Sequence, residues 1–263
     1  LQADVLLVCT GAGWSADSGL AIYRDVADVD AYRDRDLTYR DLCQPRFLEE
    51  EPAIFYGFWG GCYNDYRNVA PHEGYSIIKS WVEKKFKYTE AATALRAAQN
   101  ESGADCAGAF FAYTSNVDAH WLSAGFQPHE VHEIHGNCEQ WQCAERCTPQ
   151  RWAAPPDHRF HVDETSRLAE EDVAPQVPPR GGASTSQMAD KPPAEKYPRP
   201  WMAPVRTEPT DSASAFAFSS NWPTCITCGG KARPAVLMFN DHKYQTDHKS
   251  EETWEGWREA LTR

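Results

Sequence analysis

A short apolar run near the start of the chain ends in a turn that contains two glycines. Residues 5–8 are all apolar, and Gly11 and Gly13 follow within five positions. A strand covered on both faces of a parallel sheet is apolar throughout. Glycines directly after it let the backbone approach a phosphate at the start of the next helix. The run therefore predicts a strand, a phosphate-binding turn and a helix start, and an ordinary glycine turn is the alternative.

The elements that follow predict a parallel sheet. Apolar positions three and four residues apart predict helices over 72–86 and 91–99, and the apolar run 109–114 predicts a second buried strand. Strands that alternate with helices favour an α/β fold with helices on both faces of the sheet. Because ligands bind beyond the carboxyl ends of such strands, we expect the turn at Gly11 and the loop at Asn116 to share one site.

Two pairs of cysteines have the spacing of metal ligands. Three residues separate Cys143 from Cys147, and two separate Cys225 from Cys228. Four thiolates complete a tetrahedral zinc site and leave no open position, so a zinc ion held there would be structural rather than catalytic. Cys138 is an alternative ligand, and a set of scattered buried thiols is the alternative to any metal site.

Composition argues against several other classes of function. The formal net charge of −12 argues against direct nucleic-acid binding, because nucleic-acid surfaces of proteins are basic. A membrane span is not expected, because the chain has no uninterrupted apolar run of about 18 residues. Nine cysteines, with two pairs at metal spacing, indicate reduced thiols and an intracellular, reducing compartment rather than a disulfide framework.

A proline-rich segment separates the two cysteine pairs. Nine prolines fall between residues 175 and 209, and the surrounding stretch is poor in apolar residues. Such a composition buries too little surface to offset the entropy of an ordered chain. We expect an extended insertion over about 170–215, which is either a solvated linker or a partner-binding segment.

Five motifs occur in a fixed order around the cysteine pairs. They are Gly11-Ala12-Gly13-Trp14-Ser15, Ser18 to Arg24, Thr114-Ser115-Asn116-Val117-Asp118, His135-Gly136, and a strand over Arg233 to Phe239. In this order and spacing, the motifs and the cysteine pairs resemble the sirtuins, which are NAD-dependent protein deacylases. The resemblance is closest to a bacterial-type branch of that family.

The resemblance implies a domain organisation. Residues 1–136 and 231–263 would form a Rossmann-like NAD-binding domain, and residues 137–230 a small zinc-binding module that contains the insertion. Sirtuins continue after the equivalent of residue 263 into a strand and a turn that holds the adenosine half of NAD. The chain is therefore expected to be truncated at both ends, with the C-terminal part of the cofactor-binding domain missing.

The resemblance also assigns roles to site residues. His135 would act as general base on a ribose hydroxyl of NAD, and Asn116 would orient the ribose or a water molecule. Asp118 would bind the nicotinamide carboxamide, with Val117 beside it. An Asx-type turn is the alternative for Asn116 and Asp118. The other cofactor-binding residues implied are Gly11, Ala12, Gly13, Ser15, Tyr23, Arg24 and Ser115.

The predicted function is NAD-dependent removal of acyl groups from lysine, with release of nicotinamide and an O-acyl-ADP-ribose. The partner would be a protein or peptide that carries acylated lysine. Ala21 and Ile22 stand where the family has Pro-Asp, and Tyr23 stands where it has phenylalanine. These departures favour an alternative, an inactive relative that serves as a scaffold or as a subunit of a larger assembly. An NAD hydrolase or ADP-ribosyltransferase is a further alternative.

Overall fold

The computed structural model describes residues 3–22, 24–99, 106–171 and 212–262. Its strands are β1 Leu6–Thr10, β2 Phe110–Thr114, β3 Val131–Glu133, β4 Gly136–Cys143, β5 Trp152–Ala153 and β6 Ala232–Val236. Its helices are α1 Ala12–Asp17, α2 Arg24–Ala27, α3 Asp30–Arg33, α4 Tyr39–Leu42, α5 Phe47–Glu50, α6 Pro52–Asn68, α7 Glu73–Trp81, η1 Val82–Phe86, α8 Glu90–Gln99, α9 His120–Ser123, η2 Pro128–Glu130, α10 Ser212–Ala217 and α11 His248–Ala260. None of the helices in these ranges is long and apolar enough to cross a membrane.

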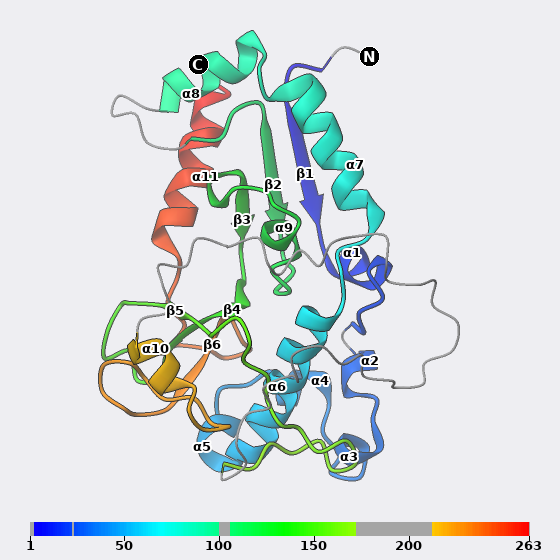
Figure 1. Ribbon diagram of the computed structural model, residues 1–263, viewed down its shortest axis with the longest axis vertical. Helices are drawn as coiled ribbons and strands as arrows, with labels where there is room; N and C mark the ends of the chain where they lie inside the picture. Colours follow the sequence, from blue (N-terminus) through cyan, green and yellow to red (C-terminus); the bar gives the residue numbers. More distant parts are fainter. Residues whose placement is uncertain (1–2, 23, 100–105, 172–211, 263) are drawn as a thin grey trace.

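Three parallel strands form the first sheet, in the order β1-β2-β3. Leu6 lies opposite Phe110 and Thr10 opposite Thr114, so β1 and β2 end at the same level. Figure 1 shows both arrows pointing toward the lower half of the molecule. Loops that follow these strands consequently leave the sheet at one edge, as the pattern of apolar runs predicts.

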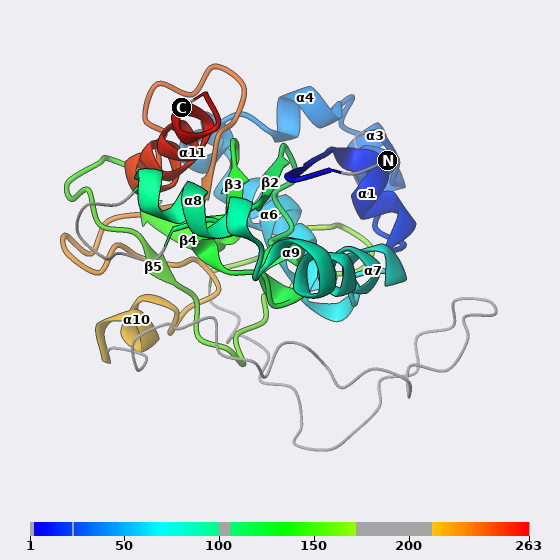
Figure 2. The ribbon, with the colours of Figure 1, turned by 90° about the horizontal axis from the view of Figure 1, so that it is seen from above.

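Helices cover the two faces of this sheet. Phe110 packs in one apolar cluster with Tyr75 of α7, whereas Phe111 packs against Trp257 of α11 on the opposite face. The indole of Trp257 also donates a hydrogen bond to the Gly108 carbonyl, at 2.7 Å. Figure 2 shows α7 to one side of the strands and α8 with α11 to the other. The predicted α/β fold with helices on both faces is confirmed.

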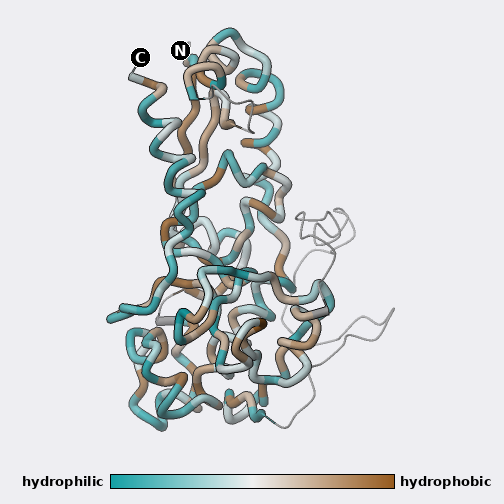
Figure 3. The backbone as a smooth tube through the Cα atoms, turned by 90° about the vertical axis from the view of Figure 1, so that its left-hand side faces the viewer, coloured by the Kyte–Doolittle hydropathy of each residue, from teal (hydrophilic) through white to brown (hydrophobic). Residues whose placement is uncertain are grey.

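The helix α11 is polar along most of its length. Figure 3 shows it as a largely teal tube beside browner strand segments. Only Trp257 and Ala260 of this helix are fully buried. A narrow apolar stripe suits a helix that contacts the sheet along one side and faces water along the other.

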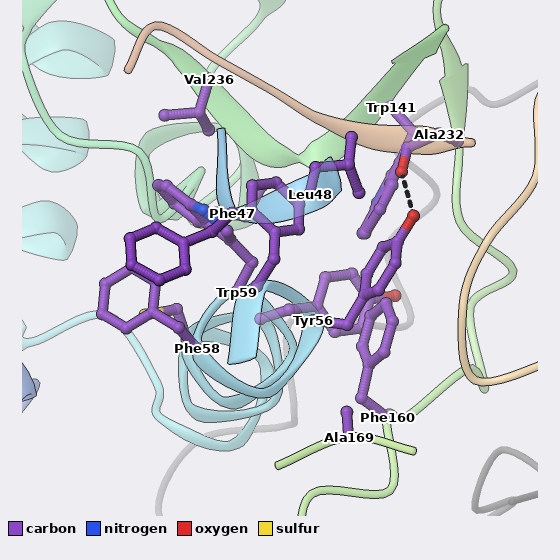
Figure 4. Close-up of a cluster of buried hydrophobic side chains, with 14 of the residues drawn as sticks. Phe47, Leu48, Tyr56, Phe58, Trp59, Trp141, Phe160, Ala169, Ala232 and Val236 are labelled. Carbon is purple, nitrogen blue, oxygen red and sulfur yellow. Dashed lines mark hydrogen bonds between the residues drawn. The ribbon is translucent and has the colours of Figure 1, made fainter. Parts of the chain in front are cut away.

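A second, antiparallel sheet has the order β5-β4-β6 and lies in the lower half of the molecule. Its apolar side shares one core with helices α3 to α6. Tyr56 of α6 donates a hydrogen bond to the Ala232 carbonyl of β6, at 2.7 Å, and Trp141 of β4 lies nearby (Figure 4). Residues on both sides of position 136 therefore contribute to this core. The domain boundaries at 136 and 230 stay a prediction.

Two elements differ in extent from the expected ones. The helix predicted over 72–86 is present, but its last five residues form the π-helix η1. The strand predicted over 233–239 spans Ala232–Val236, and the three residues that follow are not part of it. Residues 172–211, most of the predicted insertion, lie outside the described residues.

Candidate functional site

The glycine turn after β1 contacts the loop after β2. Gly11 lies at the N-terminus of α1 with extended backbone (φ −144°). The side-chain amide of Asn116 donates a hydrogen bond to the Gly11 carbonyl, at 2.9 Å. A Cβ atom added at Gly11 would lie 3.5 Å from Ser115 Oγ. The two loops are therefore held together in the folded protein, as expected from the parallel strand order.

Ser15 and Asp118 connect the same two loops below the surface. Ser15 Oγ donates a hydrogen bond to Asp118 Oδ2, and Asp118 Oδ1 accepts one from the His120 backbone N–H, at 2.9 Å. Both Ser15 and Asp118 are buried. Hydrogen bonds to a carboxylate are stronger than those between neutral groups. The Asp118 carboxylate is therefore fixed in orientation by two donors.

His135 lies directly after β3, beside these loops. Its Nδ1 is 3.1 Å from the Ser115 carbonyl oxygen. Because a carbonyl oxygen only accepts hydrogen bonds, Nδ1 carries the proton in this contact. In the neutral ring Nε2 then has a free lone pair, which is the state a general base requires. The fold thus holds His135 in the tautomer that can accept a proton at Nε2.

A carboxyl and an amide bracket His135 in the chain. Asn137 Nδ2 donates to Glu133 Oε2, and Asn137 Oδ1 accepts from the backbone N–H groups of Glu139 and Gln140 at 3.0 Å each. The bond between Asn137 and Glu133 closes the turn that carries His135. Loss of water around the Glu133 carboxyl is the main reason that its pKa rises to about 8; the bond from Asn137 lowers it in part. The negative charges of Asp118 and Asp247 raise the Glu133 pKa further, and the positive charge of Arg151 lowers it.

The raised pKa of Glu133 predicts a pH dependence of stability. The folded protein holds this proton up to about pH 8, whereas the unfolded chain loses it near the ordinary value of 4.5. The free energy of unfolding should therefore fall as the pH rises from about 4.5 to 8. The Glu133→Gln variant keeps an oxygen that accepts from Asn137 but does not titrate, so we expect a shallower fall.

Urea unfolding at a series of pH values across this window measures the effect. Glu252→Gln, on the exposed face of α11, is the matched control and should follow the wild-type slope. Equal slopes for wild type and Glu133→Gln would contradict the assignment.

One cavity of about 300 Å³ lies where the loops, α6 and the segment after β6 meet. Seven of the predicted site residues line it. They are Ala12, Ser15, Ser115, Asn116, Val117, Asp118 and His135. Gly11 and Gly13 shape the turn without lining the cavity. Tyr23 and the side chain of Arg24 lie outside the described residues.

The rest of the cavity wall comes from residues that the sequence did not assign to the site. These residues are Ala21, Ile22, Val26, Tyr39, Cys43, Phe58, Trp59, Cys62, Tyr66, Val236, Leu237, Met238 and Phe239. Helix α6 supplies four of them, and it is apolar on all sides over residues 54–63. A helix that is apolar all round is buried in a core. That signal predicts burial of α6, but not that one part of it faces a cavity.

The four predicted metal ligands come together. The sulfur atoms of Cys143, Cys147, Cys225 and Cys228 all lie within 4.8 Å of one another. Gly229 adopts a left-handed conformation (φ +70°) that closes the turn after the second pair. Burial raises the pKa of the Cys225 thiol, but hydrogen bonds from the Cys228 and Thr227 N–H groups and from the Cys147 and Cys143 thiols together lower this pKa to about 7. Four thiols in one cluster suit a structural zinc ion.

Cys138 is not part of this cluster. It is buried in the apolar core of the lower half, and burial raises its pKa well above the ordinary value. A neutral thiol in apolar surroundings packs as a small hydrophobic group. The four clustered sulfur atoms make a complete ligand set without it, so Cys138 does not replace one of them.

Loss of one ligand should remove metal and stability together. In Cys225→Ser we expect less than one zinc ion per chain and a lower melting temperature, because metal affinity at a structural site contributes folding free energy. Metal content by mass spectrometry and thermal unfolding measure the two effects. Cys9→Ser, at an exposed thiol outside the cluster, should change neither. A Cys225→Ser protein that is zinc-free and as stable as wild type would contradict a structural metal role.

Comparison with known proteins defines the class of the chain. The model of the Sir2 family matches residues 11–256. The chain therefore belongs to the Sir2 family, and the predicted sirtuin resemblance is confirmed. No curated protein sequence matches the chain.

Solved structures of Sir2 homologues match the chain at low sequence identity. A Sir2 homologue in complex with NAD is 19% identical, with 89% of this chain and 57% of the other covered and a TM-score of 0.44. Sir2Tm bound to a propionylated peptide is 15% identical, with 97% of this chain and 66% of the other covered and a TM-score of 0.49. The chain thus spans about three fifths of the length of these relatives.

Proposed function

We propose that this protein is an NAD-dependent protein-lysine deacylase. The observation that carries the proposal is the shared cavity. His135, Asn116 and the fixed carboxylate of Asp118 all belong to its lining, at the carboxyl ends of parallel strands, and this supports the proposal. This is where ligands bind in open α/β sheets. Membership of the Sir2 family supports NAD as the nucleotide.

The residues present fit the reactive half of NAD. The nicotinamide carboxamide has both donor and acceptor atoms. The buried Asp118 carboxylate can accept a hydrogen bond from the N–H group of that carboxamide. When bound, NAD supplies an anomeric carbon from which nicotinamide can leave. His135 Nε2 would accept the proton of a ribose hydroxyl, and Ser115 O would stabilise the resulting imidazolium through Nδ1–H. Asn116, tied to Gly11, would orient the ribose or a water molecule.

The substrate would be an acylated lysine in a protein or peptide. Leu237 and Phe239 line the cavity and remain 42% and 43% exposed, so they provide apolar contact surface at its mouth. A solved Sir2Tm structure contains a propionylated peptide.

All nine cysteines are free thiols, which supports our proposal that the protein works in a reducing compartment.

One observation favours the alternative of an inactive relative. Ala21 and Ile22 line the cavity and bring two apolar side chains to it. Neither of these side chains can replace an acidic side chain that binds nicotinamide. The test below separates this alternative from the deacylase.

Removal of the base should abolish turnover without unfolding the protein. In His135→Ala we expect loss of peptide-dependent nicotinamide release by at least about a hundredfold, the lower range for a general base. NAD binding by calorimetry and zinc content should persist. His248→Ala, at an exposed histidine on α11, is the matched control and should retain activity.

Two results would count against the proposal. Retained turnover in His135→Ala would refute the role of His135 as base. A wild-type protein that binds NAD and zinc but releases no nicotinamide would support the inactive relative.

A further inference from the structure

The chain crosses from the parallel sheet to the antiparallel sheet at His135. β3 ends at Glu133 and β4 starts at Gly136, so His135 lies in the short connection between the two sheets (Figure 1). Gly136 has a left-handed backbone (φ +70°), and a Cβ atom there would collide with the Ala235 carbonyl oxygen. The direction of the His135 side chain therefore depends on how β3 and β4 are held relative to each other.

Three hydrogen bonds join this connection to the loop after β2, residues 114–117. The backbone N–H groups of Ile134 and Cys138 donate to the carbonyls of the first and last residues of that loop, at 3.0 Å and 2.9 Å. Between these two bonds, His135 Nδ1 contacts the Ser115 carbonyl oxygen at 3.1 Å. The imidazole contact is thus the middle one of the series, and its geometry depends on the bonds on both sides.

β4 contains a bulge that starts two positions after His135. Asn137 pairs with Ala235 of β6, and the next pair joins Trp141 to Pro234, so residues 138–140 fall between two successive pairs. A bulge bends its strand and redirects the side chains around it, and bulges are common next to active sites. The N–H groups in the bulge need acceptors from elsewhere, because a buried polar group without a partner is costly.

The Asn137 side chain supplies such an acceptor. Its Oδ1 accepts from the backbone N–H groups of Glu139 and Gln140, at 3.0 Å each, and its Nδ2 donates to Glu133 Oε2. An amide has the donor and the acceptor that this arrangement requires. Asn137 is buried, so these bonds are shielded from water. One side chain therefore fixes the bulge of β4 and ties it to the last residue of β3.

We propose that Asn137 is a positioning residue, which holds β3 and β4 at the angle that brings His135 Nδ1 to the Ser115 carbonyl. Asn137 is not among the residues that line the cavity, so it would act on the reaction only through His135. Its effect on turnover rests on the proposed deacylase function, in which His135 is the base. Its effect on the tautomer of His135 does not.

Asn137→Ala removes all three bonds of the side chain. We expect kcat for peptide-dependent nicotinamide release to fall by about ten- to hundredfold, because displacement of a catalytic group by about an ångström has effects of this size. KM should stay close to the wild-type value, because the lost bonds are not made to the substrate. Steady-state kinetics of the full chain measure both constants.

Nitrogen NMR of isotope-labelled histidine measures the position of the imidazole proton without any turnover. His135→Ala identifies the signals of His135. In wild type we expect His135 to carry its proton on Nδ1, since the Ser115 carbonyl accepts there. In Asn137→Ala a larger share of His135 should carry it on Nε2 instead.

Two variants of Glu133 test the tie to β3. Glu133→Leu removes the acceptor of the Asn137 amide and should reproduce the loss of kcat and the tautomer shift. Glu133→Gln keeps an acceptor and should retain the wild-type tautomer and most of kcat. The two residues act as one unit, so the double variant Asn137→Ala/Glu133→Leu should lose little more than either single variant.

Asn221→Ala is the matched control. Asn221 is a fully buried asparagine that also makes three hydrogen bonds, with His161 and Glu170, but it does not line the cavity. Its substitution should lower the melting temperature about as much as Asn137→Ala does, because a similar set of buried bonds is lost. At a temperature where every variant is folded, kcat and the His135 tautomer of Asn221→Ala should equal those of wild type.

Three results would overturn the proposal. They are an unchanged His135 tautomer in Asn137→Ala, an equal effect of Asn221→Ala on the tautomer or kcat, and a Glu133→Gln variant as impaired as Glu133→Leu. If the wild-type protein releases no nicotinamide, the proposed function fails, and the NMR signals still decide the role of Asn137. A tautomer shift in Asn137→Ala and Glu133→Leu, absent from Asn221→Ala, supports that role.

Discussion

The site depends on the pairing of β1 with β2. Because Thr10 lies opposite Thr114, the two strands end together and their following loops meet. Two bonds then join the loops, from Asn116 to the Gly11 carbonyl and from Ser15 to Asp118. A shift of one residue in this pairing would turn every side chain of the strand to the other face. It would separate these partners, so the part of the cavity lining that Ser15, Asn116 and Asp118 form exists only in this register.

The lower half of the molecule completes the cavity. β4 starts at Gly136, directly after His135, and leads to the first cysteine pair at its end. β6 pairs with β4 and is followed by residues 237–239, whose N–H groups donate to the carbonyls of His135 and Cys43. The cysteine cluster holds the ends of β4 and of the turn before β6 close together. A structural metal there would therefore stabilise the apolar wall as well as the module itself.

Much of the fold and the polar residues of the site could be predicted, because these features depend on local patterns. Apolar runs identified β1 and β2, and strand order then brought Gly11 and Asn116 together. The wall formed by Trp59 and Cys43 could not be predicted, since it depends on contacts between segments far apart in the chain. Local spacing also left Cys138 open as a ligand, and only the grouping of the other four sulfur atoms in the fold decided the question.

The most direct test of the account is nicotinamide release from NAD by the full-length protein, with and without an acyl-lysine peptide. The account predicts that release depends on the peptide, because one cavity serves His135 and the acyl group together. Equal release in the absence of peptide would contradict it and would favour an NAD hydrolase.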